Sequence, residues 1–136
     1  MRSLILVIGI IVILTISGCN KVTGPEDPVP PKVETYLGYA VGDSGKIYKS
    51  LDKGASWNFQ QSGVRTKLNS VCTLTDLIAI AVGNNGIIIK TTDGGNSWIL
   101  QQSGTTVNLT KIKLNKLTNQ LWITGEQGIL LLFNVN

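Results

Sequence analysis

The chain has 136 residues, a formal net charge of +4 and 15% charged residues, which is enough chain for one domain with its own core. It contains no histidine, and this excludes the many catalytic and metal sites that depend on an imidazole. Its lysines are scattered along the sequence rather than clustered, which argues against a nucleic-acid-binding surface. We therefore expect no cofactor, no metal site and no nucleic-acid partner.

The N-terminus has the pattern of an export signal. Arg2 precedes an apolar run at residues 4–16, and small residues stand immediately before Cys19. This order resembles a bacterial lipobox, so residues 1–18 are expected to be a lipoprotein signal peptide and Cys19 to carry the lipid. A plain signal peptide or an uncleaved anchor is the alternative, although the apolar run is too short to span a bilayer comfortably.

The segment after the lipid site is expected to be a tether, residues 19–33. All four prolines of the chain fall within it, and proline-dense polar sequence stays extended. Asn20, by resemblance to Gram-negative lipoproteins, favours the outer membrane over the inner one. We therefore expect a protein anchored to the cell envelope by an N-terminal lipid; which face of the membrane it occupies is left open.

Residues 34–136 contain a duplicated segment and show no helical periodicity. Residues 41–63 and 82–104 are identical at thirteen positions and lie 41 residues apart. A third copy begins at Gly125 and Gly128 but lacks the turn and the tryptophan that follow in the other two. A period near forty residues with four strands per unit is typical of a β-propeller blade.

The strand pattern predicts an all-β fold with three, four and three strands in successive units. The units are a partial blade at residues 34–63, a full blade at 68–104 and a partial blade at 109–136. Together they form about two and a half four-stranded antiparallel blades, which is an incomplete propeller.

Two turns share one motif, Ser/Thr-x-Asp-x-Gly-x-Ser/Thr-Trp, at residues 50–57 and 91–98. The motif resembles the Asp-box, or bacterial neuraminidase repeat. Its aspartate can accept backbone hydrogen bonds, its glycine can adopt positive φ, and its tryptophan can cover the turn. We expect a structural role for the ten motif residues: Ser50, Asp52, Gly54, Ser56, Trp57, Thr91, Asp93, Gly95, Ser97 and Trp98.

The tandem motif with its preceding strand is also similar to the photosystem II stability and assembly factor family of propellers. That resemblance implies a non-catalytic, assembly-factor-like role in binding a partner. The chain departs from the family because a closed propeller needs at least four blades. The arginine cluster that the family uses for partner binding has no counterpart, since Arg65 is the only arginine after the leader.

Several functions remain as alternatives to a binding or scaffold module. Sialidases resemble one another in using three arginine side chains to bind the substrate carboxylate. A general glycosidase would need a carboxylate pair. The available carboxylates for such a pair are Glu34, Asp43, Asp76 and Glu126. We expect no enzyme, and keep a glycan-binding or glycosidase-related fragment, or a truncated propeller without an independent role, as alternatives.

Two further features bear on partners and on reactivity. Residues 129–133 form an uncharged apolar run that, as an open blade edge, would favour a protein partner or self-association. Cys72 lies in an alternating strand pattern and is expected to be a buried small apolar residue rather than a reactive thiol.

Overall fold

The computed structural model describes residues 36–135, which form ten strands and three short 3₁₀ turns. The strands are β1 (Gly38–Val41), β2 (Ile47–Ser50), β3 (Asn58–Gln60), β4 (Leu68–Thr73), β5 (Ala79–Gly83), β6 (Ile88–Thr91), β7 (Ile99–Gln101), β8 (Leu109–Asn115), β9 (Gln120–Gly125) and β10 (Leu130–Asn134). The expected leader, Cys19 and the tether lie outside the described residues. Within residues 36–135 there is no helix of the length and apolarity that a membrane crossing requires.

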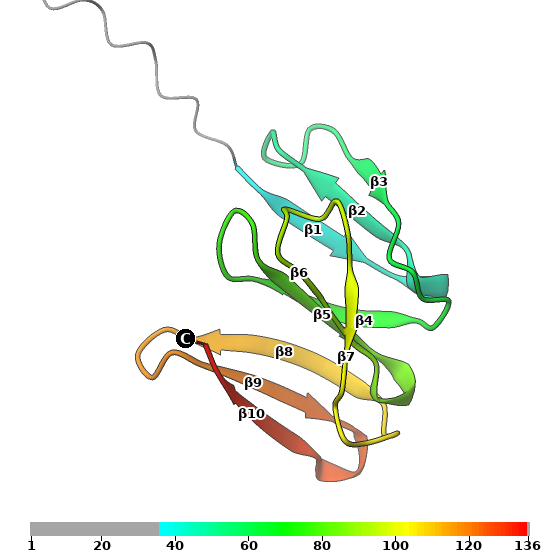
Figure 1. The fold of residues 1–136 in the computed structure, drawn as a ribbon, viewed down its shortest axis with the longest axis vertical. Coiled ribbons are helices and arrows are strands. Elements are labelled where there is room, and N and C mark those ends of the chain that lie inside the picture. The colour runs from blue at the N-terminus through cyan, green and yellow to red at the C-terminus, as the bar shows by residue number, and fades with distance from the viewer. Residues whose placement is uncertain (1–35, 136) are drawn as a thin grey trace, which may run out of the picture. The chain divides into compact units, whose positions relative to one another are not determined.

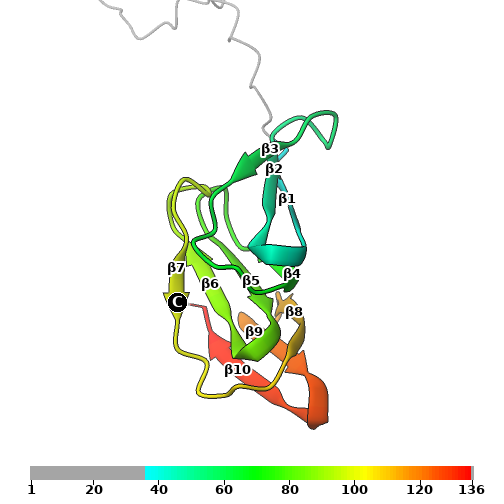
Figure 2. The ribbon, with the colours of Figure 1, turned by 90° about the vertical axis from the view of Figure 1, so that its right-hand side faces the viewer.

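The strands form three antiparallel sheets in the predicted three, four and three arrangement. Sheet 1 has the order β1-β2-β3, sheet 2 the order β4-β5-β6-β7, and sheet 3 the order β10-β9-β8. Figure 1 shows the sheets following one another in chain order, and in Figure 2 β4 and β8 lie on one side of the sheets while β7 lies on the other. The fold is therefore an incomplete β-propeller, as the sequence predicts.

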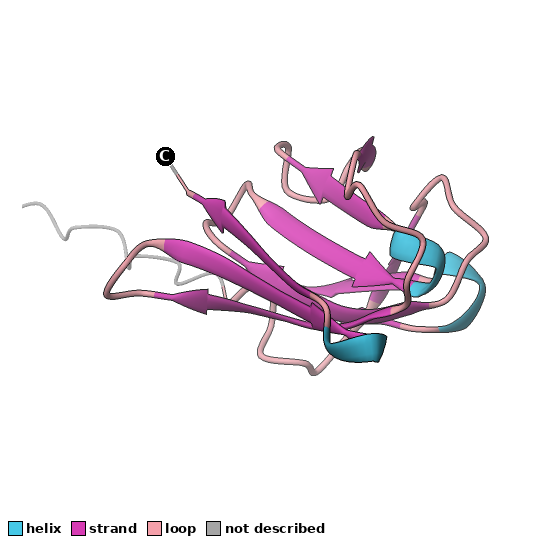
Figure 3. Cartoon of the chain, turned by 90° about the horizontal axis from the view of Figure 1, so that it is seen from below, coloured by secondary structure: helices cyan, strands magenta, loops and turns pink. Residues whose placement is uncertain are grey.

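The same 3₁₀ turn joins the second blade strand to the third in every sheet. The turns are η2 (Asp43–Gly45), η3 (Asn84–Gly86) and η4 (Glu126–Gly128), and they lie at the same end of the sheets (Figure 3). Gly86, with φ of +67°, lies so close to the next connection that a Cβ would fall 1.9 Å from the Thr105 carbonyl oxygen. Only glycine fits there, because it has no Cβ.

Register defines which positions of the three sheets are equivalent. Tyr39 pairs with Lys49 in sheet 1, Ile80 with Lys90 in sheet 2, and Trp122 with Leu132 in sheet 3. By this register β1 corresponds to β5 and β9, so the described strands of sheet 1 do not include the innermost strand of a blade, and those of sheet 3 do not include the outermost. The sequence pattern predicts both gaps, because its first unit starts late and its last unit stops early.

Two hydrophobic cores join the sheets face to face. Sheets 1 and 2 pack around Ile47, Leu68 and Ile89, together with Trp98. Sheets 2 and 3 pack around a separate cluster that includes Val82, Ile88, Leu109, Ile112, Leu121 and Ile123. Because side chains alternate along a strand, each sheet has one face for the preceding sheet and one for the next. Sheet 1 therefore has one face that no described sheet covers, and so does sheet 3.

Candidate functional site

In the first Asp turn, residues 50–57, every polar motif side chain is used within the turn. The Ser56 amide and hydroxyl donate to Asp52 Oδ1 and Oδ2 at 2.9 and 2.6 Å. The Ser50 hydroxyl donates to Asp52 Oδ1 at 2.8 Å and accepts from the Gly54 amide at 2.8 Å. Both carboxylate oxygens thus accept hydrogen bonds from the loop that they shape.

The second Asp turn, residues 91–98, repeats this network. Asp93 accepts from the Ser97 amide at 2.9 Å, from the Ser97 hydroxyl, and from the Thr91 hydroxyl at 2.8 Å. The hydroxyl and amide bonds of Ser56 and Ser97 lower the pKa of Asp52 and of Asp93 to about 2, because they stabilise the ionised form. A carboxylate with so low a pKa is poorly suited to general acid or base catalysis at neutral pH.

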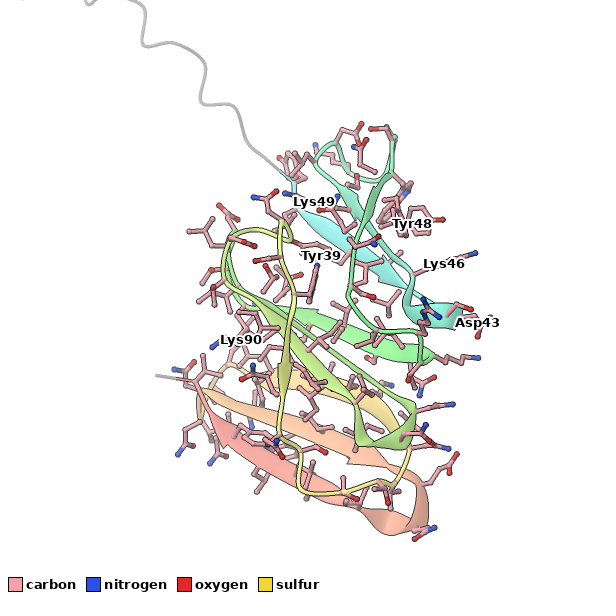
Figure 4. All side chains as sticks on the ribbon, turned by 45° about the vertical axis from the view of Figure 1, so that its right-hand side comes forward. Tyr39, Asp43, Lys46, Tyr48, Lys49 and Lys90 are labelled. Atoms are coloured by element: carbon pink, nitrogen blue, oxygen red, sulfur yellow. The ribbon has the colours of Figure 1, made fainter. Side chains whose placement is uncertain are left out.

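The second Asp turn also closes the boundary between sheets 1 and 2. The Trp98 ring, 9% exposed, meets the Tyr39 ring edge to face at 5.5 Å, and Lys49 Nζ donates to the Gly94 carbonyl at 2.6 Å. Figure 4 shows Tyr39 and Lys49 on sheet 1, beside this turn. Burial, with the Asp93 charge adding to it, raises the pKa of Tyr39.

The boundary between sheets 2 and 3 has an open cleft at the position where the second Asp turn and Trp98 close the boundary between sheets 1 and 2. Within residues 36–135 no strand of sheet 3 lies beyond β10, and the space beside β10 is a cleft of about 570 Å³, which we call the blade cleft. It is lined mainly by Leu74, Ile78, Ile80, Ile88, Lys90, Leu100, Leu121, Ile123, Phe133 and Val135. Lys90 is the equivalent of Lys49, so a cation stands at the same place above an apolar surface.

A polar groove lies at the 3₁₀ end of the sheets, with a volume of about 690 Å³. Its lining includes Asp43, Asn69, Asn84, Asn108 and Glu126. Asn69 donates to the Asn84 side chain at 2.7 Å, and Asn108 donates to Glu126 at 3.0 Å. Asp43 lies 3.3 Å from the Lys67 ammonium group.

The structure brings two of the four candidate glycosidase carboxylates into one groove and leaves a third apart from them. Asp43 and Glu126 line the polar groove, whereas Asp76 lies in a different pocket beside Trp57, and Glu34 is outside the described residues. Both groove carboxylates already have a partner within the groove. Among residues 36–135 there is also no group of three or more side chains that could hold a metal ion.

One feature of the site left no signal in the sequence, and a second left only a partial one. The Tyr39–Trp98 pair joins side chains from different blades, and no local pattern reveals such a contact. The blade cleft did leave a signal, which is the third repeat that begins at Gly125 and lacks its turn and its tryptophan. Cys72, half-buried at the edge of the second core, has a pKa that burial raises.

Comparison with known proteins identifies the architecture. No protein-family model matches the chain, and no curated protein matches it. Among solved structures it is similar to YCF48 bound to D1 peptide, with 21% sequence identity and a TM-score of 0.60 over 74% of this chain. The match spans 33% of that chain, so the protein covers about one third of the length of this solved structure. The protein is thus a β-propeller of partial extent, with the fold of YCF48.

Proposed function

We propose that the protein is a lipid-anchored envelope protein whose propeller repeats bind a partner protein without catalysis. The main observation behind this proposal is the blade cleft beside β10. The outer edge of β10 pairs with no described strand. The fold is that of YCF48, a structure described as bound to D1 peptide. The two Asp turns are Asp-boxes with a structural role, since their hydrogen bonds are made within the turns.

The proposed ligand is an extended segment of the partner with one large aromatic side chain. At the boundary of sheets 1 and 2, β7 pairs with β6 and Trp98 fills the space against Tyr39. At the boundary of sheets 2 and 3, β10 is the equivalent of β6, and its outer edge beside the apolar cleft pairs with no described strand. A peptide strand that adds to this edge gains backbone hydrogen bonds, and its aromatic side chain gains burial in the cleft. Lys90 supplies a donor for a carbonyl or carboxylate, as Lys49 does for Gly94.

The chain's own repeat provides the probe. A fluorescein-labelled peptide with the sequence of residues 91–102 contains the Asp turn, the tryptophan and the outer strand of sheet 2. We expect its fluorescence anisotropy to rise on titration with the full chain, with a dissociation constant below about 1 mM, or about 4 kcal/mol of binding free energy. The same peptide with serine in place of tryptophan should bind at least tenfold more weakly.

A matched pair of protein variants locates the binding site. Lys90→Glu should weaken binding, because it removes the ammonium donor for the peptide's glycine carbonyl, which Lys49 supplies to Gly94 within the chain. Lys46→Glu changes the net charge equally, but it alters a side chain outside the cleft lining and should leave binding unchanged. Equal binding of both peptides, or an equal effect of both variants, would contradict this site.

Lipid anchoring has its own test. Labelled palmitate fed to cells that produce the chain should appear in the protein, and Cys19→Ser should abolish this labelling. Separation of inner and outer membranes should then place the labelled protein in the outer-membrane fraction. Labelling that persists in Cys19→Ser would contradict the proposed modification.

Glycan binding is the second candidate function, and the polar groove favours it. Asn69, Asn84 and Asn108 offer amide groups, and Asp43 and Glu126 offer carboxylates, which are the groups that hydrogen-bond sugar hydroxyls. A glycan array probed with the full chain tests this candidate. Retention of one glycan class that Asn84→Ala abolishes would support it, and an empty array would exclude it for the sugars displayed.

A further inference from the structure

Each end of the stack of sheets carries an apolar face that no described sheet covers. On sheet 1 this is the leading face, which we define by Ala40, Tyr48, Trp57 and Phe59. On sheet 3 it is the trailing face, which we define by Trp122, Thr124, Leu130 and Leu132 together with Lys111 and Lys113. Strand alternation places these residues opposite those that form the two cores. Figure 4 shows Tyr48 projecting away from the body of the sheets.

The two faces contain the two halves of an aromatic pair that the chain already makes once. Trp122 is the equivalent of Tyr39, and Trp57 is the equivalent of Trp98. Tyr39 and Trp98 are in contact where sheet 1 packs on sheet 2, whereas Trp57 and Trp122 are each 46% exposed. A trailing face placed on a leading face in the same way would bring these two tryptophans together and bury both.

The rest of the trailing face fits the same arrangement. Leu130 and Leu132, 52% and 54% exposed, stand on β10 at positions that would meet strands of a second sheet 1. The two lysines stand on β8, the innermost strand of sheet 3, and the described strands of sheet 1 include no innermost strand that would meet them. Within the chain, the equivalent positions on β4 are covered by β8, as the Ile112 amide donating to Ser70 Oγ at 3.3 Å shows.

The trailing face is therefore apolar where strands of a second copy's sheet 1 would contact it, and charged where no described strand of that sheet would reach it. The ammonium groups of these lysines would stay hydrated in the space that no described strand fills, so the contact between the two faces would not require their desolvation. This match between charge pattern and strand count favours another sheet 1 as the occupant over an apolar ligand of arbitrary shape. We propose that two copies of this chain assemble head to tail, each trailing face packing on the other's leading face.

The assembly closes into a ring of six blades. The described residues of each copy contribute three sheets, and closed propellers contain about four to eight blades. In a ring of six, three consecutive blades turn through half a circle, so two copies close the ring. A head-to-tail contact that closes leaves no exposed end face, whereas one that does not close grows into a filament. The blade cleft lies on the outer edge and stays accessible in this ring.

Sedimentation equilibrium of the full chain in a density-matched detergent tests the assembly. We expect twice the protomer mass, in one species. Trp57→Arg and Trp122→Arg should each raise the dimer dissociation constant by more than about a hundredfold, because each substitution damages both contacts of the ring. Leu117→Arg, at a 97% exposed position on the β8–β9 turn, is the matched control and should remain dimeric.

Mixing two defective variants identifies the head-to-tail geometry. Trp57→Arg combined with Trp122→Glu should restore a dimer, since the mixed ring has one native contact and one arginine–glutamate contact. A dimer formed by two identical surfaces would not be restored in this way. The far-UV circular dichroism spectrum of each variant must match that of the unmodified chain. If a charged variant fails to fold, Trp57→Ser and Trp122→Ser are used instead, singly and mixed. A monomer, a growing polymer, or a dimer that withstands both substitutions would overturn the proposal.

Discussion

Gly86→Ala is expected to destabilise the protein far more than the same change at Gly128. Both glycines occupy the last position of equivalent 3₁₀ turns, with φ of +67° and +74°. An alanine in this left-handed region costs about 1–2 kcal/mol at either site. At Gly86 the new Cβ would also fall 1.9 Å from the Thr105 carbonyl oxygen, whereas nothing lies within 4 Å at Gly128.

The overlap at Gly86 involves backbone, which cannot rotate away as a side chain can, so it adds a further cost of about 1–3 kcal/mol. The total is about 2–5 kcal/mol for Gly86→Ala and about 1–2 kcal/mol for Gly128→Ala, against a typical unfolding free energy of about 5–15 kcal/mol. Urea unfolding followed by circular dichroism measures both losses from the transition midpoints. Equal midpoint shifts in the two variants would refute the reasoning, because only the close approach of the next connection distinguishes the sites.

Three further predictions concern the motif residues and the thiol. Trp98→Ala should lower the unfolding free energy by about 3–5 kcal/mol, and Trp57→Ala by about 1 kcal/mol in dilute monomeric protein, because only Trp98 is buried; equal losses would contradict this. The folded-state pKa of Asp52 and of Asp93, about 2, lies below the ordinary 3.8. The contribution of the two ionised carboxylates to the free energy of unfolding is therefore full above about pH 5 and is lost as the pH falls towards 2. In urea unfolding measured at a series of pH values, the unmodified chain should lose stability over this range, and the double variant Asp52→Asn with Asp93→Asn should lose less. Cys72 should react with a disulfide reagent at least tenfold more slowly in the folded than in the unfolded chain, because burial raises its pKa.

The opposite environments of Trp57 and Trp98 illustrate how far a repeat motif can be followed. The two residues share their motif and their local turn, and the hydrogen bonds around Asp52 and Asp93 are nearly the same. Trp98 is buried because sheet 1 packs over it, whereas Trp57 lies on a face that no described sheet covers. Motif identity therefore predicts the turn, while the position of the blade within the stack decides the contribution of the tryptophan to stability.

The blade cleft shows the same limit for a candidate site. The incomplete third repeat indicated that sheet 3 would lack its outer strand. The size and lining of the cleft depend on side chains from two sheets, with Leu121 and Phe133 standing where sheet 2 has Ala79 and Thr91. These larger side chains fill part of the space, and what remains is a property of the packed pair of sheets.

The amino-acid sequence by itself determined the local structure of this protein: strands, the Asp turns with their positive-φ glycines, and a blade period near forty residues. These features depend on interactions between residues close together in the chain, so composition and spacing are sufficient to predict them. The tertiary structure alone decided which faces are covered, which tryptophan is buried, where the cleft opens, and that Trp57 and Trp122 are exposed equivalents of a buried pair. Those properties arise from contacts between sheets, and such contacts depend on how each blade packs against its neighbours rather than on its own sequence.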